Sequence, residues 1–196
     1  MHLNDASTDR VPPVLYHVTS TVLPVGAVLH PYTLGQETLR LLRRAEQALA
    51  EGPDAIRPLL AGAEWSGLTT GGGYRAEMVV LEAAFERVRV RITPDLPSRY
   101  GVVFAWDTLA RAAQYRIAYC PTGLIHHCSL VIGRSLVRDG SLVVEASETT
   151  NLITPRHEDL LQLEEHAERY WLGQGPMAFP EVLVQGTVVV EGIVAG

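Results

Sequence analysis

The stretch Leu15-Tyr16-His17-Val18-Thr19-Ser20, close to the start of the chain, decides the fold. Its β-branched and aromatic residues are typical of a strand. A second apolar stretch, Leu23-Pro24-Val25-Gly26-Ala27-Val28-Leu29, follows it. His17 lies alone between apolar neighbours, a setting in which a His is more often a packing residue than a ligand contact. Its role therefore depends on what the rest of the chain contains.

Two later segments bear on that role. The first, Gly101-Val102-Val103-Phe104-Ala105-Trp106, predicts a strand that leads into a helix ending at Tyr115. The second, Phe179-Pro180-Glu181-Val182-Leu183-Val184, lies near the C-terminus and predicts a late strand with a carboxylate at its start. The chain thus presents a His, an aromatic residue and a Glu, each at the edge of a predicted element.

Taken in order, these three segments resemble the motifs with which ADP-ribosyltransferases bind nicotinamide adenine dinucleotide (NAD). The resemblance implies that His17 hydrogen-bonds a ribose, with the hydroxyl residue Thr19 beside it. It implies that Tyr115 stacks on nicotinamide and that Glu181 is the catalytic carboxylate. NAD would be the substrate, and no metal is implied. We also expect His17 and Glu181 to face one cleft.

The chemistry of that reaction explains the residue types. Breaking the bond between nicotinamide and ribose leaves positive charge on the sugar, so a fixed carboxylate stabilises the transition state more than the substrate. An aromatic ring holds the planar nicotinamide, and a His orients the sugar without exchanging a proton.

The middle of the chain adds a narrower resemblance. Residues 82–89 and 93–100 are similar to a bacterial family of domains of unknown function related to ADP-ribosyltransferases. Within them Arg99 could reach a dinucleotide phosphate or form an ordinary salt bridge. The chain departs from the ADP-ribosyltransferase pattern at one position. Many members of that family carry a Tyr in the second strand, where this chain has Val103 or Phe104. Phe104 could supply the stacking surface but no hydroxyl.

The resemblance implies an α+β fold with a split, antiparallel or mixed β-sheet and flanking helices. We expect a flexible tail over residues 1–13 and one domain over 14–196. The implied function is an NAD-dependent mono-ADP-ribosyltransferase, which transfers ADP-ribose to a protein, a nucleic acid or a small molecule. A non-catalytic binding module on the same fold, or an NAD glycohydrolase, stays open.

Composition sets the cellular context. The 196 residues carry a net charge of −6, with 47% hydrophobic residues, values that predict one globular domain without a large nucleic-acid footprint. No apolar run is long enough for a membrane span, and the first ten residues lack the pattern of a signal peptide. We therefore expect a cytoplasmic protein with no membrane partner and with Cys120 and Cys128 reduced.

Hydrophobic periodicity predicts the remaining elements. Helices are expected over residues 36–51, 74–90 and 154–171, with a short helix capped by Asp54 and a flexible Gly-rich loop over 66–73. Strands are expected over residues 102–106, 116–120, 125–132, 141–146 and 181–193. Glu82 and Glu86 are expected to be solvated charges. A zinc site formed by Cys120, His126, His127 and Cys128 is disfavoured because adjacent strand residues point to opposite faces.

Overall fold

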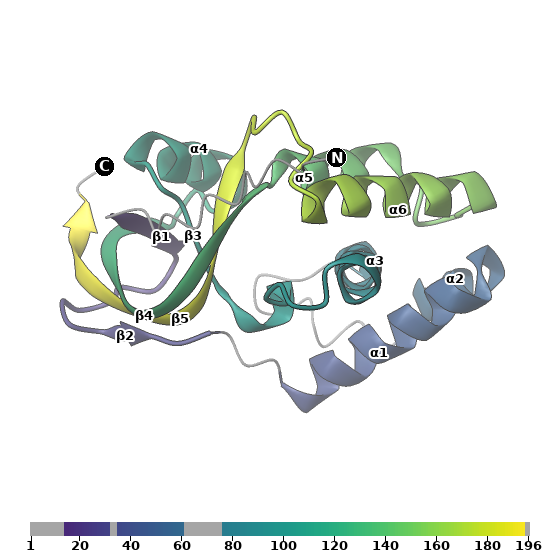
Figure 1. Ribbon diagram of the computed structural model, residues 1–196, viewed down its shortest axis with the longest axis horizontal. Helices are drawn as coiled ribbons and strands as arrows, with labels where there is room; N and C mark the ends of the chain where they lie inside the picture. The colour runs from purple at the N-terminus through teal and green to yellow at the C-terminus, as the bar shows by residue number, and fades with distance from the viewer. Residues whose placement is uncertain (1–13, 32–34, 61–75, 195–196) are drawn as a thin grey trace, which may run out of the picture. The chain divides into compact units, whose positions relative to one another are not determined.

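The computed structural model of the protein describes residues 14–31, 35–60 and 76–194 (Figure 1). Its strands are β1 (Leu15–Thr19), β2 (Val28–Leu29), β3 (Val103–Ala105), β4 (Leu124–Asp139) and β5 (Pro180–Val194). Its helices are α1 (Gln36–Glu51), α2 (Pro53–Leu60), α3 (Ala76–Ile92), α4 (Leu109–Tyr119), α5 (Ser141–Thr149) and α6 (His157–Trp171), with a 3₁₀ turn, η2, at Arg99–Gly101. The expected tail over residues 1–13 and the expected loop over residues 66–73 lie outside the described residues.

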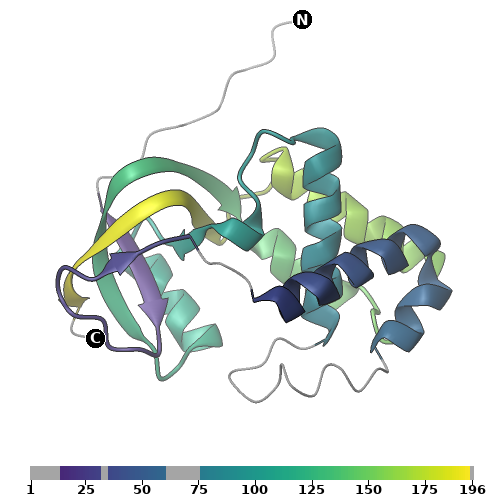
Figure 2. The ribbon, with the colours of Figure 1, turned by 90° about the horizontal axis from the view of Figure 1, so that it is seen from below.

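The strands form one antiparallel sheet in the order β1-β4-β5-β2, and β3 also pairs with β5. An isolated antiparallel bridge between Tyr16 and Trp106 brings the end of β3 back to β1. Figure 2 shows β4 and β5 as long, strongly curved ribbons. The α+β class is therefore confirmed, whereas the particular ADP-ribosyltransferase topology stays a prediction.

Two glycines permit the close approach of β4 and β5. Gly133 adopts a φ of 123°, which L side chains rarely reach. A Cβ added at Gly186 would overlap the carbonyl oxygen of Ile132 and lie 2.8 Å from the Cα of Gly133. The two strands can stay paired at this point only because neither glycine has a side chain.

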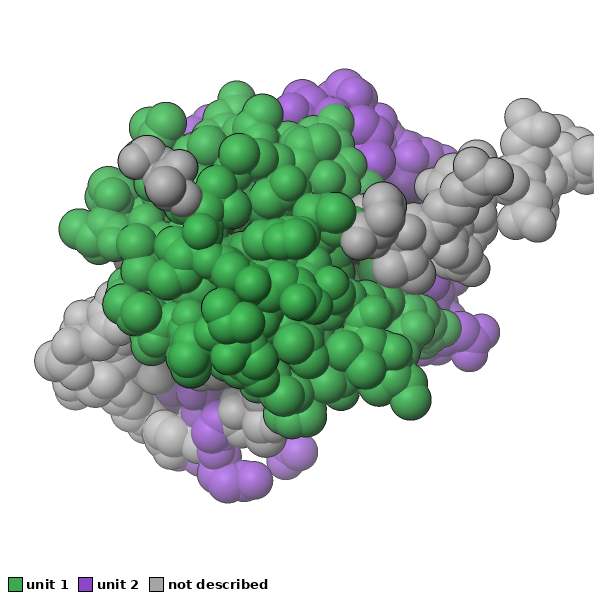
Figure 3. All heavy atoms as spheres, turned by 90° about the vertical axis from the view of Figure 1, so that its left-hand side faces the viewer, with its two compact units in different colours: residues 1–33, 100–138, 179–196 green, residues 34–99, 139–178 purple. Residues whose placement is uncertain are grey.

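The chain divides into two compact units, coloured separately in Figure 3. Unit 1 comprises residues 1–33, 100–138 and 179–196, and within the described chain it contains the sheet and α4. Unit 2 comprises residues 34–99 and 139–178 and contains α1, α2, α3, α5 and α6. The units interleave along the chain, so no single position in the sequence separates them.

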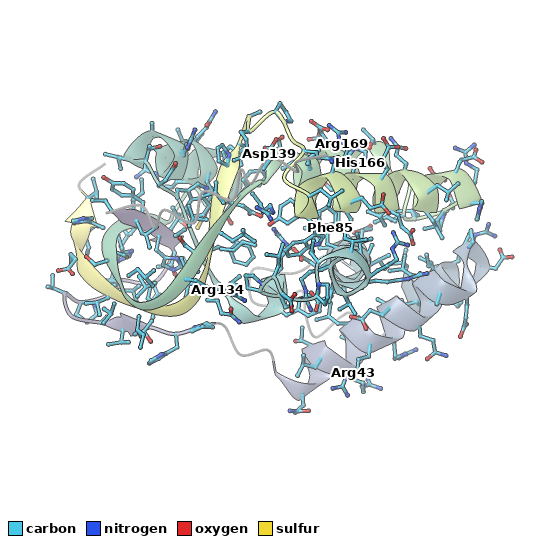
Figure 4. All side chains as sticks on the ribbon, viewed as in Figure 1. Arg43, Phe85, Arg134, Asp139, His166 and Arg169 are labelled. Carbon is cyan, nitrogen blue, oxygen red and sulfur yellow. The ribbon has the colours of Figure 1, made fainter. Side chains whose placement is uncertain are left out.

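The core of unit 2 forms around aromatic residues of α3 and α6. Phe85 lies between these helices (Figure 4), with its ring centroid 5.3 Å from that of Tyr170 in an edge-on arrangement. The indole N–H of buried Trp171 donates to the Phe85 carbonyl at 2.6 Å, which satisfies a polar group that would otherwise be costly to bury.

Two segments predicted as strands are helical. Residues 116–119 continue α4, and Cys120 caps its end. The rings of Tyr115 and Tyr119 pack one helical turn apart, with centroids 5.3 Å apart. Residues 141–146 form α5, which buries Leu142 and Ala146 at helical spacing and packs on α6. In both segments tertiary packing outweighs the strand preference of the β-branched and aromatic residues.

The three long helices were predicted close to their observed bounds. Helix α1 has the predicted limits, and α3 is shifted by about one half-turn. Helix α6 begins at His157, because the backbone N–H of Arg156 donates to the Asp159 carboxylate at 2.8 Å and so caps the helix there. Asp54 lies in the first turn of α2. None of the described helices is long and apolar enough to cross a membrane.

Candidate functional site

His17 lies near the middle of β1 and is half-buried. Its Nδ1 lies 2.9 Å from the carbonyl oxygen of Phe104 on β3. Because a carbonyl oxygen only accepts, this geometry assigns the proton to Nδ1. Burial lowers the pKa of His17, so the ring is neutral near pH 7 and its Nε2 is a hydrogen-bond acceptor. An acceptor at this position can receive a hydroxyl proton, as a ribose contact would require.

Thr19 shares the face of β1 that carries His17, because strand side chains alternate. It is the last residue of the strand, and its hydroxyl accepts from the backbone N–H of Thr21 at 3.2 Å. The pair of residues that the first motif places together is thus on one face.

Tyr115 lies on α4, which follows β3 directly. The hydroxyl of Thr108 accepts from the Arg111 backbone N–H at 3.4 Å and so caps the start of this helix. The ring of Tyr115 then packs on Trp106, with centroids 4.2 Å apart and planes tilted by 32°. The second motif therefore contributes two packed aromatic rings, those of Trp106 and Tyr115, to unit 1.

Phe179 is a member of this cluster that the sequence reasoning missed. Its ring is nearly parallel to that of Tyr115, with planes 26° apart and centroids 6.4 Å apart. Tyr119 lies against the same two rings. The signal that could have found Phe179 is its position, two residues before Glu181. Phe104 is half-buried, and the rings of Trp106, Tyr119 and Phe179 pack against Tyr115.

Glu181 is the second residue of β5 and is buried. In the register between β3 and β5, Ala105 pairs with Val182. Continuing that register by one residue places Trp106 beside Glu181. Paired residues in an antiparallel sheet point to the same face, so Glu181 shares the face of Trp106.

His17 does not share that face, which corrects the expected common cleft. Since Tyr16 pairs with Trp106, His17 lies on the face of Ala105 and therefore of Val182, while Glu181 follows the opposite alternation. The buried side chains agree, because Ala105 and Val182 belong to one core cluster and Trp106 to another. The sheet brings Glu181 to the side of Tyr115 and leaves His17 on the other side.

Arg99 is held in a buried ion pair of unit 2. Its guanidinium donates to both oxygens of the Glu82 carboxylate, at 2.9 and 3.1 Å, and to the hydroxyl of Tyr170 at 2.6 Å. Of the two roles left open for Arg99, the salt bridge is the one observed. Glu82 is only 8% exposed, so its assignment as a solvated charge was wrong. Glu86 is likewise engaged, by Arg89 at 2.7 Å.

The disfavoured zinc arrangement does not assemble. His126 and Cys128 lie on one face of β4 and His127 on the other, since they alternate along the strand. Within the described residues no three metal-ligating side chains converge. Burial raises the pKa of the Cys128 thiol to about 11, so it is protonated and unreactive at neutral pH.

No family model matches the chain, and no curated protein has a matching sequence.

Proposed function

We propose that the protein binds NAD, cleaves the bond between nicotinamide and ribose, and transfers ADP-ribose to an acceptor protein, nucleic acid or small molecule. The observation that carries the proposal is the row formed by Tyr16, Trp106 and Glu181. These residues come from the three sequence motifs. Tyr16 pairs with Trp106, which directly follows β3, and Tyr115 packs on Trp106. Glu181 is opposite Trp106 when the register of β3 with β5 is continued by one residue.

The aromatic cluster supplies a surface for a planar ring. A ring held between two others needs about 7–8 Å between them, because each face requires a carbon–carbon contact of about 3.5–4.0 Å. The centroids of Tyr115 and Phe179 are 6.4 Å apart. Because the two rings are no farther apart than their centroids, a third ring does not fit between them, and nicotinamide would stack on one outer face of the pair.

The proposed reaction uses the charge of Glu181. As the glycosidic bond breaks, its electron pair leaves with nicotinamide and the ribose carbon gains positive charge. The Glu181 carboxylate stabilises that charge, after which a nucleophilic atom of the acceptor bonds to the carbon and loses its proton. With water as the acceptor the same steps give NAD hydrolysis.

Nicotinamide release from NAD tests this function, and Glu181→Gln is the decisive variant. It keeps the size of the side chain and removes the charge, so release should fall about a hundredfold or more while binding changes little. Glu191→Gln is the matched control, because Glu191 is exposed on the same strand. Equal rates in the wild type and both variants would remove Glu181 from the chemistry.

A binding module is the second candidate, and the separation of His17 from Glu181 on the sheet favours it. This candidate predicts NAD binding without nicotinamide release. Calorimetry would then show weaker binding by Tyr115→Ala and nearly unchanged binding by Tyr115→Phe, because the ring face supplies the contact. Absence of NAD binding by the wild type would refute both candidates.

A further inference from the structure

The hydrogen bonds between β1 and β3 stop one rung earlier than the strands allow. Tyr16 and Trp106 exchange both backbone hydrogen bonds, at 2.8 and 2.9 Å. In an antiparallel ladder such doubly bonded pairs recur every second residue. The next pair would therefore join Val18 to Phe104, whose N–H and C=O groups point toward the opposite strand.

A side chain takes the place of that rung. Within the described chain, the bridge between Tyr16 and Trp106, the residue that follows β3, is isolated and no further pair extends it along the two strands. The Phe104 carbonyl, which the Val18 N–H would reach in a continued ladder, instead accepts from Nδ1 of His17 at 2.9 Å. The imidazole thus uses the carbonyl that the next rung of the ladder would need.

We infer that His17 is a positioning residue that holds β1 and β3 apart by capping the Phe104 carbonyl, and so keeps the Val18 backbone out of the ladder. The side chain of Val18 packs with Trp106, and Tyr115 packs against the same cluster. The point at which β1 and β3 separate, at Val18 and Phe104, therefore lies next to this aromatic cluster. An effect of His17 on NAD turnover rests on the proposed function, whereas its effect on the separation of the strands does not.

Amide hydrogen exchange in the free protein, followed by NMR, tests the separation of the strands. In the wild type the Tyr16 amide, which donates to Trp106, should exchange slowly, and the Val18 amide at least tenfold faster. His17→Val removes the donor and keeps a strand-forming residue, so the ladder should close and Val18 exchange should slow at least tenfold. His17→Asn is the matched control, because its amide nitrogen takes the position of Nδ1 and should leave Val18 exchange fast.

Equal protection of Tyr16 and Val18 in the wild type would overturn the inference, even if His17→Val fails to fold. Unchanged Val18 exchange in a folded His17→Val variant would overturn it as well.

Nicotinamide release by the same variants tests the link to NAD. His17→Val should lower kcat/KM for NAD at least tenfold, and His17→Asn should lower it less. If the exchange pattern is as expected but the wild type releases no nicotinamide, the proposed function fails and the role of His17 in the strands stands. If the exchange pattern is absent, the role of His17 fails whatever the turnover.

Discussion

Gly186→Ala is expected to lower the free energy of unfolding by about 3 kcal/mol. The added Cβ would lie 2.8 Å from the Cα of Gly133 and overlap the Ile132 carbonyl oxygen. Carbon atoms in contact need about 3.5–4.0 Å, so β4 must move away by about 1 Å. That movement breaks about two ladder hydrogen bonds, each worth about 1 kcal/mol, and loosens the packing around them.

Urea unfolding followed by circular dichroism measures this effect, and Gly192→Ala is the matched control on the same strand. No atom lies within 4 Å of a Cβ added at Gly192, so its stability should change by no more than about 0.5 kcal/mol. The slope of the unfolding transition should stay the same in both variants. Equal midpoints for Gly186→Ala and Gly192→Ala would refute the close approach of the two strands.

Three further changes test other parts of the structure. Burial lowers the pKa of both His17 and His126 below 6.5. As the pH drops below about 6.5, the unfolded chain therefore takes up protons before the folded protein does. The free energy of unfolding should then fall, by up to about 1.4 kcal/mol per pH unit for each His. Glu82→Gln leaves the buried Arg99 charge without its partner and should destabilise the protein by about 3–5 kcal/mol in urea unfolding. Thr108→Ala removes the cap of α4 and should lower stability by about 0.5–1 kcal/mol, since its hydrogen bond is long.

Each of these expectations has a contrary outcome. Stability that is flat between pH 6.5 and 5, measured by thermal unfolding, would mean that the two histidines are not held neutral. Glu168 is 45% exposed, so Glu168→Gln serves as the control for Glu82→Gln and should change stability by less than about 1 kcal/mol. If both Glu variants lose the same stability, the buried pair has no special role. Thr108→Ser should restore the cap.

The sequence predicted the segments whose local pattern and packing agree. Helix α1 repeats its apolar residues at helical spacing and ends at Gly52, and β5 is a long β-branched run. The pattern failed at residues 116–120, where Tyr115, Ile117 and Tyr119 alternate as strand residues do, although the rings of Tyr115 and Tyr119 meet one helical turn apart.

The candidate site was only partly accessible to sequence reasoning. The strand order was not predicted: β1 and β5, which carry His17 and Glu181, do not pair with each other, and β4 lies between them in the sheet. The face of each side chain depends on strand register, which distant pairings set, and a shift of one residue reverses it. For that reason the separation of His17 from Glu181 was not foreseen. The partner of Arg99 lies 17 residues away on α3, a distance at which no local pattern links the two charges.

The position of β5 determines the order in which the protein can assemble during synthesis. This strand pairs with β2 and β3 and lies beside β4, yet it follows all three in the chain and so leaves the ribosome after them. The helical unit has all its segments by residue 178, so its core can form while β2 and β3 still lack a partner. Completion of the sheet then waits for contacts between segments far apart in the chain, which form slowly. Until that moment the aromatic rings on α4 lack Phe179.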